Sequence, residues 1–237
     1  MKYPQLEDTP IREIIFTITH DDIVAEGCFE KFIALDSINE SFKEILPSRL
    51  QEFIVNHRGE AEANTLNSGY RLNGKSEVLN IRLGSFSYHY IAGYKNFVDI
   101  QSTLSNYWNE LIKVVKDPIK ITSVSVRYIN EFPTDDDYRE SRIIQVYPKY
   151  SSDRKIQAFQ NIVSFSYEDQ ENYDVMIVST MPSNKSVLLD ITVTNAFDPK
   201  DEPKPSLDDS FKPLQEIKNR AFFDSITAKA LLRYLKK

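Results

Sequence analysis

The sequence predicts an α+β fold in which a curved, mainly antiparallel sheet carries helices on one face. Most segments alternate apolar and polar residues with a period of two, as strands with one buried face do. These segments follow one another as meanders, and the two long helical patterns, at 96–115 and near the C-terminus, stand apart from them. Glycine is scarce, with 6 residues in 237, which disfavours glycine-rich phosphate loops.

The first half is predicted to contain a strand, a short helix, three strands and a long helix. The opening strand, 12–21, places Ile14, Phe16 and Ile18 on one face. A helix is predicted over 36–50, with Ser37 as its N-cap and Pro47 as its end. The three strands that follow have a turn at Asn73-Gly74 and a bulge near Gly84, and their ranges are 50–61, 69–77 and 77–91.

The best helical pattern in the chain occupies residues 96–115. Its apolar residues recur at spacings of three and four and form one wide stripe: Phe97, Ile100, Leu104, Trp108, Leu111 and Val115. This stripe is typical of a helix that packs on a core, and Pro118 separates it from the next strand.

The second half is predicted to repeat the plan of strand, link, three strands and helix. A connection at 138–150 and a proline-rich loop at 198–210 interrupt its strands, which are predicted at 118–132, 155–169, 172–181 and 185–197. Two consecutive helices end the chain, the first beginning near Ser206, with Pro213 either kinking it or setting its first turn. We therefore predict a single α+β domain over 1–237, with two pseudo-repeated halves, 1–117 and 118–237, as an alternative.

Composition narrows the classes of partner. The formal net charge is −6 and no run of Lys and Arg is present, so bulk binding to nucleic acid is not expected. The single cysteine, Cys28, allows neither an intramolecular disulfide nor a cysteine-based zinc site. No signal peptide or long apolar run is found, so we expect a cytoplasmic protein that is not membrane-bound and needs no cofactor.

Four polar residues stand out because they occur within otherwise apolar strands. Arg127 and Asn130 lie in the strand "VSVRYINEF", Glu13 lies in the opening strand, and Asp190 lies within "VLLDITV". Charges in such runs are usually paired when they are buried. No P-loop, dinucleotide fingerprint or Ser-His-Asp arrangement is recognised, and the three histidines have no ligand spacing.

Three interpretations of these residues stay open. In the first, Glu13 or Asp190 neutralises Arg127 inside the fold and Asn130 holds a turn. In the second, Arg127 binds an anionic group of a ligand through both arms of its guanidinium. In the third, Glu13 and Asp190 act as a catalytic pair of carboxylates. No metal site is assigned.

The chain resembles a sporadically distributed prokaryotic family of proteins of similar length and unknown function. The resemblance runs through the whole chain and rests on four features, which are the Pro-Ile-x-Glu start (Pro10, Ile11, Glu13), the Arg-Tyr-Ile-Asn strand (127–130), the Leu-Asp strand (Leu189, Asp190) and the C-terminal Phe223, Ile226 and Thr227. It implies that Glu13, Arg127, Asn130 and Asp190 belong to the family pattern, and it supplies no activity. Glu131 stands where similar proteins often carry a basic residue, which weighs against anion binding.

Two functions are therefore expected as alternatives. The first is a non-catalytic accessory protein that recognises a protein or peptide partner, in a defence or toxin-regulation setting that the resemblance implies. Its many Tyr and Phe residues suit adhesive surfaces, and open sheet edges can capture an extended segment or pair two copies as a homodimer. The alternative is a metal-dependent enzyme or binder acting on a nucleotide or other phosphate-bearing ligand, with Arg127 on the anion and Glu13 and Asp190 on Mg²⁺. Whether the protein is an enzyme stays open, with the non-catalytic function favoured.

Overall fold

A computed structural model describes most of the chain. The described residues are 3–4, 6, 9–21, 27–55, 61–93, 96–115, 118–134, 143–145, 158–183, 186–198 and 206–235. The predicted connection at 138–150 and the proline-rich loop at 198–210 fall largely outside these residues.

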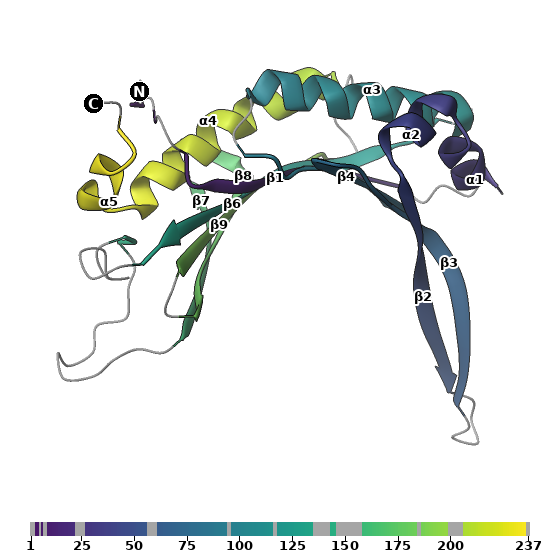
Figure 1. Ribbon diagram of the computed structural model, residues 1–237, viewed down its shortest axis with the longest axis horizontal. Coiled ribbons are helices and arrows are strands. Elements are labelled where there is room, and N and C mark those ends of the chain that lie inside the picture. The colour runs from purple at the N-terminus through teal and green to yellow at the C-terminus, as the bar shows by residue number, and fades with distance from the viewer. Residues whose placement is uncertain are drawn as a thin grey trace.

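The fold is α+β, as predicted, and is built on one open sheet of nine antiparallel strands. The strand order is β2-β3-β4-β5-β1-β6-β9-β8-β7. The sheet curves like an arch, with the β2–β3 hairpin descending on one side and β6 to β9 on the other (Figure 1). The helices α3 and α4 run along its convex face (Figure 1).

The first half differs from its prediction in several elements, and the helix α1 was not predicted. Its elements are β1 (Ile11–His20), α1 (Cys28–Ile33), α2 (Asp36–Ser41), β2 (Glu44–Val55), β3 (Ala61–Asn73), β4 (Glu77–Arg82), β5 (Ser85–Tyr90) and α3 (Phe97–Val115). The predicted helix over 36–50 is wrong beyond Ser41, because Pro47 lies in strand β2 and the N-cap position is Leu35, not Ser37. The predicted strand over 77–91 is two strands, since Gly84 adopts a positive φ of 74° and forms a turn in place of a bulge.

The second half follows its predicted order. Its elements are β6 (Ile121–Pro133), β7 (Phe159–Tyr167), β8 (Gln170–Ser183), β9 (Ser186–Ala196), α4 (Leu207–Ser225) and α5 (Ala228–Leu232). The Ser206 side chain caps α4 by accepting a hydrogen bond from the amide of Asp209, and the Thr227 side chain caps α5 in the same way through Ala230. Because α4 continues through Pro213, this proline does not set the first turn.

The first strands of the two halves meet at the centre of the sheet. β1 pairs with β5 on one side and with β6 on the other. β6 pairs in turn with β9, so each half places its first and last strands side by side. Four strands, not the predicted three, follow the link in the first half, because the β4–β5 hairpin adds one.

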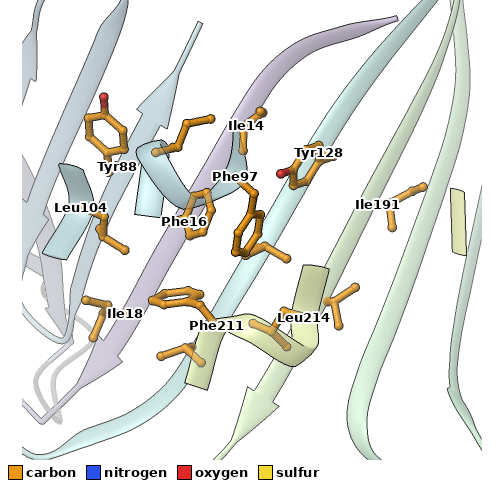
Figure 2. Close-up of a cluster of buried hydrophobic side chains, with 14 of the residues drawn as sticks. Ile14, Phe16, Ile18, Tyr88, Phe97, Leu104, Tyr128, Ile191, Phe211 and Leu214 are labelled. Carbon is orange, nitrogen blue, oxygen red and sulfur yellow. The ribbon is translucent and has the colours of Figure 1, made fainter. Parts of the chain in front are cut away.

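The core lies between the convex face of the sheet and the two long helices. All six residues of the predicted apolar stripe on α3 are buried. Phe16, in the central strand β1, contacts the rings of Phe97 on α3 and Phe211 on α4, with ring centroids 5.0 and 5.2 Å apart (Figure 2). One side chain thus joins the sheet to both helices. Within the described part of the chain, no helix is long and apolar enough to cross a membrane.

Candidate functional site

Three of the four predicted site residues lie on the face of the sheet opposite the long helices. Alternation along β1 directs Ile14, Phe16 and Ile18 into the core, and Glu13 to the other face. In β6 the same alternation places Arg127 on the face of Glu13, because Arg127 pairs with Ile15 and Glu13 pairs with Ile129. We call this surface the open face.

Arg127 forms an ion pair with Asp190 of the neighbouring strand β9. The Nε atom donates to both carboxylate oxygens at 2.9 and 3.0 Å, and Nη2 donates to Oδ2 at 2.5 Å. These hydrogen bonds raise the pKa of Arg127 above its ordinary value. The structure therefore places Asp190, and not Glu13, as the principal partner of Arg127.

The Arg127–Asp190 pair lies at the surface on its Arg127 side only. The Arg127 side chain keeps 46% of its surface exposed, whereas Asp190 keeps 14%. Solvent therefore screens part of the attraction, and exposed pairs contribute about 1 kcal/mol or less to stability. The guanidinium is held in a fixed orientation on the open face and contributes little to the core.

Glu13 pairs with His89 of strand β5. The Glu13 Oε1 atom lies 2.7 Å from His89 Nδ1. On the other side of the ring, Nε2 lies 2.8 Å from Asn80 Nδ2 and 3.2 Å from Ser87 Oγ. Because the amide nitrogen of Asn80 can only donate, Nε2 is the acceptor and Nδ1 carries the proton that is donated to Glu13.

Together these contacts form a polar row across five adjacent strands, β4, β5, β1, β6 and β9. Its members are Asn80, Ser87, His89, Glu13, Arg127 and Asp190. The Oδ1 atom of Asn80 and the Oγ1 atom of Thr192 on β9 are buried without a hydrogen-bond partner among the described residues. We call the six members the polar row, and Thr192 does not belong to it.

The Ser87, His89 and Glu13 contacts were not anticipated from the sequence. A serine beside Nε2 and a carboxylate beside Nδ1 is the order of groups in hydrolase triads, although no Ser-His-Asp arrangement was recognised in the sequence. The closeness of Ser87 and His89 could have been predicted from the sequence, since they are two residues apart and share a strand face. Glu13 could be added only from the β1–β5 register. In this protein Asn80 Nδ2 lies closer to His89 Nε2 than Ser87 Oγ does. The acceptor position of the imidazole is therefore already taken by the hydrogen bond from Asn80.

Burial lowers the pKa of His89 below its ordinary value of 6.5. The hydrogen bond that His89 donates to Glu13 and the negative charge of Glu13 oppose this shift, whereas the charges of Arg71 and Arg127 reinforce it. The neutral imidazole is therefore the form that the folded protein favours, in agreement with its role as an acceptor at Nε2.

Acidification is expected to destabilise the protein through His89. Above pH 6.5 the ring is neutral in both states, so its contribution to stability is complete. As the pH falls below 6.5 the unfolded chain takes up the proton first, and stability is lost until the pH passes below the pKa in the folded protein. Urea unfolding of wild type and His89→Gln between pH 7.5 and pH 5, a range of about one pH unit or more on each side of 6.5, measures this contribution. A stability difference between the two proteins that is constant over this range would contradict it.

Asn130 does not belong to the polar row. It lies on the opposite face of β6, is 1% exposed, and donates through Nδ2 to the carbonyl oxygens of Leu189 and Tyr128 at 3.0 and 3.3 Å. The prediction that it holds a turn is wrong, because it lies within strand β6. It faces a register shift in β1 between Ile11 and Glu13, so it ties β6 to β9 beside this irregularity.

The alternative function places Glu13 and Asp190 on Mg²⁺. Among the described residues no group of three or more His, Cys, Asp and Glu side chains is arranged to hold a metal ion. Asp190 is engaged by Arg127 and Glu13 by His89. Both carboxylates that the phosphate-binding alternative places on Mg²⁺ are therefore already paired.

Strand β7 forms one edge of the sheet and exposes aliphatic side chains on both faces. It is the last strand in the order, so its outer edge has no neighbouring strand among the described residues. Ile162 and Val163 are 58% and 38% exposed, and as consecutive strand residues they point to opposite faces. Ile162 lies on the open face, opposite Val178, near Met176, which is 39% exposed.

The two edges of the sheet differ in how they are protected. Edge strands usually avoid pairing with other chains by means of charges or proline. At the opposite edge, β2 has Glu44, Pro47 and Arg49. The β7 sequence, FQNIVSFSY, contains no charged residue and no proline. Strand β7 is therefore the edge that is chemically suited to accept another strand.

The comparisons with known proteins add little. No family model matches the chain, and no curated protein matches it. Among solved structures, the chain is similar to the crystal structure of the di-domain ARO/CYC StfQ from the steffimycin biosynthetic pathway, with 11% sequence identity over 93% of this chain and 98% of that chain. The TM-score is 0.20, so this likeness supports no argument about fold or activity.

Proposed function

We propose that the protein is a non-catalytic binding protein that captures an extended segment of a partner protein along strand β7. The partner segment would add a tenth strand through backbone hydrogen bonds, and its alternate side chains would contact the aliphatic residues exposed there. The observation that carries the proposal is the uncharged, proline-free edge strand with Ile162 and Val163 exposed on its two faces.

The polar row supports this function by supplying fixed contacts beside the edge. Arg127 and Asp190 lie on β6 and β9, and β9 is separated from β7 only by β8. Both charges are already neutralised, so a partner can lie across them without leaving an unpaired ion. Exposed Met176 on β8 and Ile162 on β7 extend this surface to the edge.

A separate partner is favoured over a second copy of this chain. Pairing two copies of a nine-residue strand buries only the edge, whereas a stable interface needs about 1,200–2,000 Å² in total. A partner that also covers part of the open face can reach this area. The accessory role in defence or toxin regulation is the setting that the family resemblance implies.

The proposal is tested by selecting binders from a display library of random peptides and measuring their affinities for variants of the edge. Val163→Lys places a charge in the edge strand and is expected to weaken the selected peptides at least tenfold. The matched control is Leu46→Lys, which adds the same charge at an exposed residue, 43% accessible, on β2 at the other edge. This control is expected to leave affinity within about threefold of wild type, a change below 1 kcal/mol.

Hydrogen exchange locates the bound segment directly. Bound peptide is expected to slow exchange of backbone amides in β7, because they gain hydrogen-bond partners. Peptides that are weakened by Leu46→Lys and not by Val163→Lys would contradict the proposal. Sedimentation of wild type as a dimer, and of Val163→Lys as a monomer, would also contradict the proposal. A second copy of this chain, and not a separate partner, would then pair with β7.

A further inference from the structure

A second candidate site lies on the helix-covered side of the sheet, away from the polar row. A cavity of about 650 Å³ opens between the N-terminal segment, strand β6 and helix α4. Small-molecule sites commonly measure ~300–1,000 Å³. Aromatic rings dominate its apolar lining, and they belong to Tyr3, Phe97, Tyr128, Phe222 and Phe223. Asn130, which belongs to the family pattern, lines it as well.

The cavity contains a buried lysine, Lys218 of α4. Lys218 is only 9% exposed, and its Nζ atom lies 4.0 Å from the centre of the Tyr128 ring. The ammonium group donates one hydrogen bond, to Asn219 Oδ1 at 2.6 Å. A lysine ammonium has three protons to donate, so this contact and the face of one ring leave it incompletely satisfied.

No carboxylate of the described residues forms an ion pair with Lys218. Burial lowers its pKa to about 7. Two lysines, Lys212 and Lys218, line the cavity with one glutamate, Glu216. Among the described lining residues these side chains carry an excess of one positive charge when both lysines are protonated, and a bound anion would supply the counter-charge and favour the protonated form of Lys218.

We propose that this cavity binds a small aromatic carboxylate whose carboxylate group pairs with Lys218 and whose ring packs against the aromatic lining. The buried ammonium selects an anion, and the rings of Tyr3, Phe222 and Phe223 select a flat apolar body. The small volume limits the ligand to a metabolite-sized molecule. This site is independent of the proposed β7 function, because it shares no residue with β7.

Isothermal titration with 2-naphthoate and its neutral counterpart, 2-naphthamide, tests the proposal. Wild type is expected to bind 2-naphthoate at least tenfold more tightly than 2-naphthamide. Lys218→Met, which keeps the length of the side chain and removes its charge, is expected to abolish this preference. The matched control is Lys75→Met, since Lys75 is an exposed lysine that does not line the cavity, and its effect is expected to stay below threefold.

A measurement on the unmodified protein guards against effects of the variant on folding. Acetic anhydride acetylates accessible amines, and mass spectrometry follows each lysine separately. 2-Naphthoate is expected to slow acetylation of Lys218 at least tenfold and to leave exposed Lys75 unchanged. Equal binding of naphthoate and naphthamide, a naphthoate affinity that Lys218→Met does not alter, or no protection of Lys218 at millimolar naphthoate would overturn the proposal.

Discussion

Replacing Phe16 by alanine is expected to lower the free energy of unfolding by about 3–5 kcal/mol. Phe16 is fully buried in the central strand β1, and its ring contacts Phe97 of α3 and Phe211 of α4. The substitution leaves a cavity at the point where the sheet and both long helices meet. Since whole proteins are stable by only about 5–15 kcal/mol, this one change removes a large share of the total.

Urea unfolding followed by circular dichroism measures the loss. The matched control is Val98→Ala, which shortens an aliphatic side chain next to Phe97 that is 58% exposed. It is expected to change stability by no more than about 0.5 kcal/mol. A loss below about 1 kcal/mol for Phe16→Ala would mean that the core at this junction can close around the missing ring, and that Phe16 does not join the two helices to the sheet as described.

Gly69→Ala is expected to be the most damaging small substitution outside the core, with a loss above about 3 kcal/mol. Gly69 lies in β3 with a φ of 139°, which side chains rarely adopt. An added β-carbon would overlap the carbonyl oxygen of Ile81 in β4 and lie 2.7 Å from the Cα atom of Arg82. Both are backbone atoms, so the β3–β4 pairing itself must shift.

Gly93→Ala separates the two causes of this loss. Gly93 also has a positive φ, of 89°, but apart from its chain neighbours no atom of the described residues lies within 4 Å of the added carbon. It is therefore expected to lose only the conformational cost, about 1–2 kcal/mol. Thermal unfolding and hydrogen exchange of β3 and β4 amides measure both variants. Equal losses for Gly69→Ala and Gly93→Ala would contradict a steric role for the β3–β4 approach.

Errors in the predicted elements of the first half arose where tertiary contacts overrode local pattern. The segment 36–50 has a capping motif and apolar residues at helical spacing, yet only 36–41 is helical. Residues 44–50 instead pair with β3, where a partner strand supplies the hydrogen bonds. Gly84 similarly marked an irregularity, but only the pairing of β4 with β5 shows that the chain reverses there.

Three of the six residues in the polar row were singled out in the sequence, and their pairings were not. Glu13, Arg127 and Asp190 stood out as charges in apolar strands, and they do share one face of the sheet. Their partners depend on which strands are neighbours. His89 reaches Glu13 across a separation of 76 residues, and Lys218 reaches Tyr128 from a helix that begins far downstream. No local spacing encodes such contacts.

Local patterns in the sequence were enough to predict the α+β class, the period of most strands, the buried stripe of α3 and the start of α4 near Ser206, because each depends on residues within a few positions of one another. The folded structure was needed to find the strand order, the pairing of Arg127 with Asp190, the exposure of β7 at the edge and the burial of Lys218 in a cavity. The physical reason is that these features arise from packing between distant segments, and register and burial are properties of the neighbours that folding brings together.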